Sequence, residues 1–135
     1  MKIIVTGGMG LIGHNVVQKL VQTGHEVFII DNSTNYGIIP IPEITYLLEQ
    51  RRMKIPGVFT YSMDIADTEA IERVIGTLRP DAIIHLASFP RQKVVNADPV
   101  SGSNVMSTGL INILECCKKY EVKKIVYTSS SMVYG

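Results

Sequence analysis

The chain has no tryptophan, two cysteines and three histidines among its 135 residues. The histidines are scattered and lack metal-ligand spacing, so no metal site is expected. Cys116 and Cys117 are neighbours in a segment of helical periodicity, where adjacent side chains point in different directions, so a disulfide between them is not expected. We predict that both are small core residues in a reducing compartment, which makes the cytoplasm the expected location.

An excess of charge of one sign is also missing, as are long apolar runs. The formal net charge is +1, which gives no reason to expect a nucleic acid or an anionic membrane as a partner. No apolar run approaches the ~18 residues that cross a bilayer. The segment Met1–Val5 runs directly into glycines and is too short for a signal peptide. With 46% hydrophobic and 19% charged residues, the composition is that of one globular α/β domain.

Short apolar runs alternate with segments of helical periodicity along the whole chain. Strands are predicted at residues 2–6, 25–31, 57–62, 82–86 and 122–128. Helices are predicted at residues 11–23, 43–53, 67–78, with Asp67 as N-cap, and 99–120, with Val105, Leu110, Ile113, Leu114 and Cys117 on its apolar face. Residues 32–42 and 89–98 are expected to be loops. The alternation predicts a Rossmann-type, doubly wound parallel sheet with strand order 3-2-1-4-5 and a ligand at the carboxyl ends of strands 1 and 4.

Four glycines lie between the first predicted strand and the first predicted helix. They fit two registers, Gly8-x-Gly10-x-x-Gly13 and Gly7-x-x-Gly10-x-x-Gly13. In either register, positions without side chains let the backbone turn sharply and approach a pyrophosphate, and the helix N-terminus presents unpaired N–H groups. The position of the glycines between strand and helix therefore predicts a dinucleotide site.

Asp31 ends the second predicted strand, at the distance beyond the glycines where an acid hydrogen-bonds the adenine ribose hydroxyls. A carboxylate there repels the additional phosphate of NADP, and no arginine follows in the next loop to receive that phosphate. We therefore expect NAD as the cofactor.

Further motifs follow at matching intervals: Asp31-Asn32, Asp64-Ile65, His85-Leu86-Ala87-Ser88, Asn104-Val105 and Tyr127–Gly135. Together with Thr6-Gly7-x-x-Gly10-x-x-Gly13, this ordered set resembles the extended short-chain dehydrogenase/reductase family, the NAD-dependent sugar-nucleotide epimerases and dehydratases. The resemblance runs along the entire chain and favours the register that begins at Gly7.

The resemblance implies a set of cofactor contacts and one catalytic hydroxyl. Counting back from Val133-Tyr134-Gly135, that hydroxyl belongs to Ser130, which is expected to hold the reacting sugar oxygen. The implied NAD contacts are Gly7, Gly10, Leu11, Ile12, Gly13, Asp31, Asn32, Asn35, Asp64, Ile65, Leu86, Ala87, Ser88 and Asn104.

In the family, a tyrosine of a Tyr-x-x-x-Lys motif after strand five is the base. Here Tyr120 and Lys124 have this spacing, but the tyrosine lies ahead of the fifth predicted strand, at the end of the preceding predicted helix, so we interpret the match as chance. The expectation is an NAD-binding domain over residues 1–135 that ends after strand five, without the catalytic helix or the sugar-nucleotide domain. Such a chain is expected to be inactive by itself and to belong to an enzyme that forms a homodimer and acts on a nucleotide-sugar.

Ser131-Met132 replace the acids that usually follow the active-site hydroxyl of dehydratases, which favours a 4-epimerase and leaves reductases and decarboxylating enzymes open. A noncatalytic NAD(P)-binding regulator or sensor of the same fold is the alternative. A methyltransferase that binds S-adenosylmethionine is disfavoured by Asp64-Ile65 and the strand-five signature.

Overall fold

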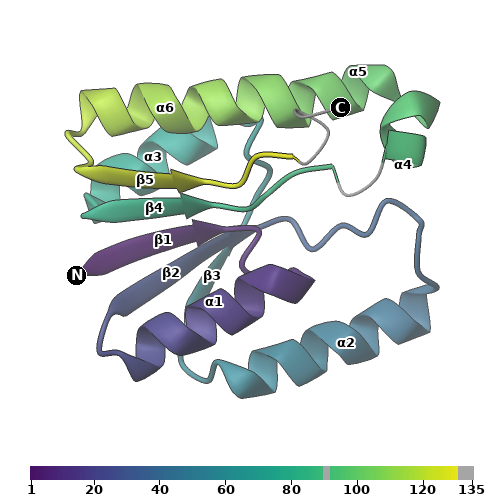
Figure 1. Cartoon of the computed structure of the whole chain (residues 1–135), viewed down its shortest axis with the longest axis horizontal. Helices are drawn as coiled ribbons and strands as arrows, with labels where there is room; N and C mark the ends of the chain where they lie inside the picture. The colour runs from purple at the N-terminus through teal and green to yellow at the C-terminus, as the bar shows by residue number, and fades with distance from the viewer. Residues whose placement is uncertain (90–91, 131–135) are drawn as a thin grey trace.

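The computed structural model describes residues 1–89 and 92–130. Within them, five parallel strands form one sheet in the order β3-β2-β1-β4-β5 (Figure 1). This order confirms the arrangement that the sequence predicts. The strands are β1 (Lys2–Thr6), β2 (Glu26–Asp31), β3 (Phe59–Ser62), β4 (Ala82–His85) and β5 (Lys124–Tyr127).

Helices cover both faces of the sheet, α1 and α2 on one and α3 and α6 on the other (Figure 1). The helices are α1 (Leu11–Gln22), α2 (Ile41–Lys54), α3 (Thr68–Leu78), α4 (Gln92–Ala97), α5 (Pro99–Ser103), the π-helical turn η1 (Asn104–Thr108) and α6 (Gly109–Lys119). The N-cap of α3 is the expected one, because the Asp67 side chain accepts a hydrogen bond from the Ala70 N–H. None of the described helices is long and apolar enough to cross a membrane.

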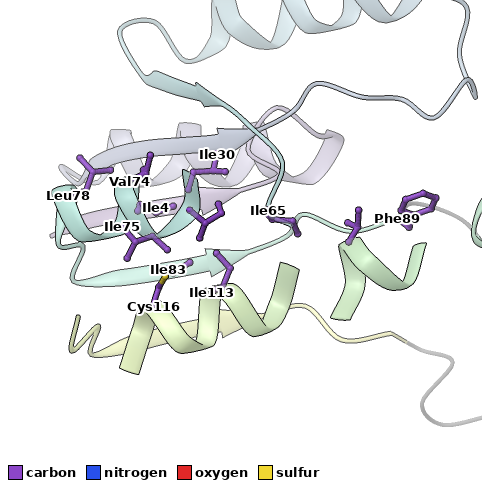
Figure 2. Close-up of a cluster of buried hydrophobic side chains, with 12 residues drawn as sticks. Ile4, Ile30, Ile65, Val74, Ile75, Leu78, Ile83, Phe89, Ile113 and Cys116 are labelled. Atoms are coloured by element: carbon purple, nitrogen blue, oxygen red, sulfur yellow. The ribbon is translucent and has the colours of Figure 1, made fainter. Parts of the chain in front are cut away.

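The sheet is buried because successive residues of its central strand pack into different cores. Ile4 belongs to the cluster beneath α3 and α6, which Figure 2 shows, and Ile3 and Val5 belong to the cluster beneath α1. All three side chains are at most 5% exposed. Strands that are buried on both faces read as continuous apolar runs, which explains why the sequence placed β1 correctly.

Three expectations about local structure differ from what is observed. Residues 92–97, expected to be a loop, form α4, which is too short for a helical period to be read from the sequence. The long helix expected at 99–120 is divided by η1, where the Gly109 N–H donates to the Asn104 carbonyl five residues earlier. Leu114, expected on the apolar face, is 44% exposed, and Cys116 is buried in its place.

Candidate dinucleotide-binding site

A cavity of about 470 Å³ lies where the carboxyl ends of β1, β2, β3 and β4 meet. Its walls come from the turn after β1, the loop after β2, the residues that follow β3 and β4, and one side of α2. The order of the strands reverses between β1 and β4, so this is the place where open parallel sheets hold their ligands.

The turn after β1 is built from glycines because neighbouring atoms leave no space for side chains. Gly7 has φ +68°, and a Cβ on it would lie 2.8 Å from the Ala87 nitrogen. A Cβ on Gly13 would overlap the Gly7 carbonyl oxygen. Gly7, Gly10 and Gly13 line the cavity, whereas Gly8 packs against Ile29 outside the cavity. The cavity is therefore lined by the register that begins at Gly7.

The N-terminus of α1 opens into the cavity. Among the described residues, no side chain caps Gly10, the N-cap residue, and the first turn contains no acidic residue. The first N–H groups of a helix have no partner within it, so this end presents hydrogen-bond donors and the positive end of the helix dipole. Leu11 and Ile12 are 71% and 64% exposed although they are apolar. This end of the cavity therefore suits a ligand in which an anionic group is attached to an apolar one.

Two carboxylates lie in fixed orientations at the ends of β2 and β3. Asp31 accepts hydrogen bonds from the Met9 N–H at 2.9 Å and the Ser33 N–H at 2.7 Å. Asp64 accepts from the Ala66 N–H at 2.8 Å and from the Asn32 side-chain amide at 3.2 Å. A carboxylate has about four acceptor positions, so each acid keeps capacity for a ligand hydroxyl or amine.

Thr6 and His85 join β1 to β4 beneath the cavity. The Thr6 hydroxyl accepts from the Leu86 N–H at 3.2 Å and the Ala87 N–H at 3.1 Å, and lies 2.7 Å from His85 Nδ1. With its acceptor positions used, the hydroxyl donates its proton to Nδ1, so Nε2 carries the imidazole proton. Burial lowers the pKa of His85 to about 4. The imidazole is therefore neutral at physiological pH, and its ring lies nearly parallel to that of Tyr127, with the ring centroids 5.8 Å apart.

Most of the residues that the sequence proposed for the site line this cavity. They are Gly7, Gly10, Leu11, Ile12, Gly13, Asp31, Asn32, Asp64, Ile65, Leu86, Ala87 and Ser88. Asn35, Asn104 and Ser130 are not among the lining residues. Asn35 instead closes its own loop, donating to the Ile39 carbonyl at 2.9 Å and accepting from the Gly37 N–H at 2.7 Å.

Asn104 is exposed at the start of η1, and its neighbour Val105 lines the cavity. Ser130 is exposed beyond the end of β5, and Thr128 lines the cavity two residues earlier. The rest of the strand-five signature, residues 131–135, lies outside the described residues.

Tyr36 lines the cavity but was not foreseen. It adopts φ +54° and its ring centroid lies 4.1 Å from that of Phe89, so it links the loops after β2 and β4. Burial, Asp64 and Asp31 raise the pKa of its hydroxyl, which therefore stays protonated. Only the position of Tyr36 beside Asn35 in the sequence hinted at a role.

Two contacts made by helices were also absent from the sequence analysis. Arg51 of α2 lines the cavity and donates from Nη1 to the Met9 carbonyl at 2.8 Å. The buried Asn112 of α6 donates to the Ile65 carbonyl at 2.9 Å and so fixes the backbone of a lining residue. Both contacts join segments more than 40 residues apart, and no local pattern signals them.

The sequence is similar to that of known sugar-nucleotide enzymes. The family model for GDP-mannose 4,6 dehydratase matches residues 4–135. UDP-glucose 4-epimerase of Neisseria meningitidis serogroup C is 35% identical over 134 residues, which are 99% of this chain and 38% of that protein.

Solved structures with similar folds include several UDP-glucose 4-epimerases. The enzyme of Thermus thermophilus in complex with NAD superposes with a TM-score of 0.78 at 34% identity, covering 96% of this chain and 38% of that one. The enzyme of Bifidobacterium longum in complex with NAD+ and UDP gives 0.80 at 30% identity, covering 100% and 38%.

The chain spans less than two fifths of the length of these relatives. Within that part, the family model covers all but the first three residues. The resemblance to the sugar-nucleotide epimerases and dehydratases is thereby confirmed, and the chain belongs to the GDP-mannose 4,6 dehydratase family.

Proposed function

We propose that residues 1–135 form the NAD-binding domain of a nucleotide-sugar 4-epimerase. The observation that carries this proposal is the cavity of about 470 Å³ with a backbone cradle whose glycines admit no side chain. The 4-epimerases of T. thermophilus and B. longum, which share this fold, were crystallised with NAD, and that supports NAD as the ligand here.

Different residues around the cavity suit different parts of the cofactor. The turn from Gly7 to Gly13 and the open end of α1 would hold the pyrophosphate, because they offer N–H donors and close approach of the backbone. Asp31 and Asn32 would hold the adenine ribose, and Asp64 with Ile65 the adenine. Leu86, Ala87 and Ser88 would lie along the remainder.

Asn35 and Asn104 have supporting roles in this proposal. Asn35 keeps the loop after β2 in the conformation that presents Ser33 and Thr34 to the cavity. Asn104 begins the π-helical turn that brings Val105 to the cavity wall.

Bound NAD supplies a hydride acceptor, while the protein supplies binding, orientation and electrostatics. Ser130 would hydrogen-bond the reacting sugar oxygen. His85 is kept neutral by burial, so we assign it a structural role at neutral pH rather than proton transfer.

We further propose that these 135 residues bind the cofactor without completing turnover. Tyr120 and Lys124 have the spacing of the family's catalytic pair, but Tyr120 precedes the amino end of β5, whereas the cavity lies at the carboxyl ends of the parallel strands. Its hydroxyl donates to Glu72 at 3.1 Å, so it is engaged away from the site.

Titration of the chain with NAD tests the cofactor assignment. A ligand that binds only the native state raises the free energy of unfolding by about 2.7 kcal/mol at a hundred times its Kd, so the thermal midpoint should rise with NAD concentration. An unchanged midpoint at millimolar NAD would sink the proposal.

The class of reaction needs a second measurement. The NAD-loaded chain is mixed with UDP-glucose or UDP-galactose while absorbance at the NADH band and sugar interconversion are followed. We expect neither to change beyond a control without sugar. Interconversion of the two sugars would contradict the proposal that this chain does not turn over.

A further inference from the structure

Arg51 brings a positive charge to the adenosine end of the cavity from a helix that the sequence analysis did not connect with the site. It lies on the side of α2 that also contributes Ile44 and Leu48 to the cavity wall. Its guanidinium is half-buried and donates from Nη1 to the Met9 carbonyl at 2.8 Å. A guanidinium carries five N–H donors, so this contact, the one that Arg51 makes among residues 1–89 and 92–130, leaves most of its hydrogen-bonding capacity for a ligand.

Asp31 and Arg51 hydrogen-bond the two backbone polar groups of Met9, its N–H and its carbonyl. Asp31 accepts from the Met9 N–H at 2.9 Å, and Arg51 donates to the Met9 carbonyl. Their charges therefore lie within about one Debye length, ~10 Å, of each other. A ligand that binds beside the Asp31 carboxylate therefore also interacts electrostatically with the Arg51 cation.

The two charges act in opposite directions on the cofactor. A carboxylate binds the adenine ribose hydroxyls and repels a phosphate on them, whereas a guanidinium binds phosphate through paired N–H donors. The sequence predicts NAD over NADP in part because the loop after β2 contains no arginine. Arg51 reaches the same region from α2, 20 residues after Asp31 in the sequence.

We propose that Arg51 is a specificity-determining residue that receives the 2′-phosphate of NADP, so that the site prefers NAD through Asp31 yet retains measurable affinity for NADP. This inference rests on the proposed function, since it concerns the same cavity. The chemistry is that of a phosphate monoester on the adenosine ribose, recognised by a partly buried guanidinium.

The test compares Kd values for NAD and NADP, measured by calorimetry on the unmodified chain and on Arg51→Gln. Glutamine keeps side-chain N–H donors but has no charge, and the Kd for NAD reports any loss of support for the glycine turn, because NAD uses that turn and lacks the 2′-phosphate. We expect the Kd for NADP to rise about tenfold or more, the effect of a lost charge-assisted hydrogen bond, and a much smaller change for NAD, which has no phosphate on the adenine ribose.

Arg52 provides the matched control, because it is the next residue of α2 and is exposed outside the cavity. Arg52→Gln makes the same change of net charge and should leave both Kd values unaltered. Arg51→Lys, which keeps the charge without the planar fork, should recover part of the NADP affinity.

The outcomes are distinct. Equal losses of NAD and NADP affinity in Arg51→Gln would make Arg51 a support for the turn only, and unchanged affinities would remove any role; either result overturns the inference. Loss of NADP affinity in Arg52→Gln as large as in Arg51→Gln would overturn it as well. Failure of the unmodified chain to bind NAD would instead refute the proposed function.

Discussion

The glycines of the turn after β1 differ in what a methyl group would meet. A Cβ on Gly13 would overlap the Gly7 carbonyl oxygen, which cannot move far enough to relieve the overlap because it accepts a hydrogen bond from the Gly10 N–H at 3.0 Å. We predict that Gly13→Ala lowers the free energy of unfolding by about 3 kcal/mol, the upper end of the usual cost of overpacking, and strongly weakens NAD binding. Urea unfolding and calorimetry measure the two effects.

Gly10→Ala is the matched comparison for this prediction. A Cβ there meets the same carbonyl oxygen at 3.1 Å, a contact that a small shift relieves. Its cost should therefore be clearly below that of Gly13→Ala. Similar losses of stability in the two variants would contradict this account of the turn.

His85 gives the fold a dependence on pH. Burial lowers its pKa from 6.5 to about 4, so the unfolded chain binds more protons between these values. This contribution is fully present above pH 6.5 and is lost as the pH falls towards 4. The shift corresponds to about 3 kcal/mol of unfolding free energy. Urea unfolding between pH 7.5 and 4.5 should show that decline.

His85→Gln isolates this effect from the other titrating groups. The variant is expected to be less stable at pH 7.5, because the contact with Thr6 changes, but its free energy of unfolding should fall less between pH 6.5 and 4.5. Glu72 and Asp98 also have lowered pKa values, yet they are present in both proteins and cancel in the comparison. Parallel curves for the two proteins would refute the prediction.

At the scale of elements, the strands and most helices could be predicted from local sequence patterns. The features that could not be predicted depend on contacts between residues far apart in the sequence. The apolar runs of β1 and β4 and the N-cap at Asp67 were readable because each signal lies within a few residues. The π-helical turn was not readable, since it lies where α6 packs closely on Ile65: a Cβ on Gly109 would lie 2.6 Å from the Ile65 side chain.

The residues of the candidate site likewise fall into those that local sequence patterns predict and those that they do not. Lining residues on the turns after β1, β3 and β4 were foreseen, because the carboxyl ends of parallel strands are fixed by the sheet. Arg51 was missed because its helix has a polar, weakly periodic sequence that gives no indication of which side faces the sheet.

The helix α2 differs from α1, α3 and α6 in how it is held. Within the described structure it has no buried residue, although Ile44, Leu48 and Arg51 face the cavity. Segments with few buried contacts open at low free-energy cost. We predict that the backbone amides of α2 exchange faster than those of α1 in the free chain and become protected when NAD binds. Hydrogen exchange followed by mass spectrometry measures both.

The amides of α3 serve as the internal reference, because that helix buries four residues on the opposite face of the sheet and does not line the cavity. NAD should alter their exchange far less than that of α2. Protection of α2 in the free chain equal to that of α1, or no response of α2 to NAD, would contradict the idea that cofactor completes its packing.

For the molecule as a whole, the two faces of the sheet are covered unequally. Ile125 of β5 packs into the core beneath α3 and α6. Val126, which alternation directs to the other face, is 48% exposed, because α1 and α2 lie under the opposite half of the sheet (Figure 1). In the part of the chain that the structure describes, β5 pairs with β4 alone and is an edge strand. Its outer backbone groups and its uncovered face are both accessible.

Exposed, apolar edge strands promote association between copies of a chain. We therefore predict that the 135-residue chain self-associates as its concentration rises, and that Val126→Lys suppresses this, since a charge on an edge strand opposes pairing. Light scattering coupled to size-exclusion chromatography measures the mass. Phe59→Lys is the control, because Phe59 is 59% exposed on β3, the opposite edge strand. If the unmodified chain stays monomeric at high concentration, or if Phe59→Lys suppresses association as well as Val126→Lys does, the β5 edge is not the cause.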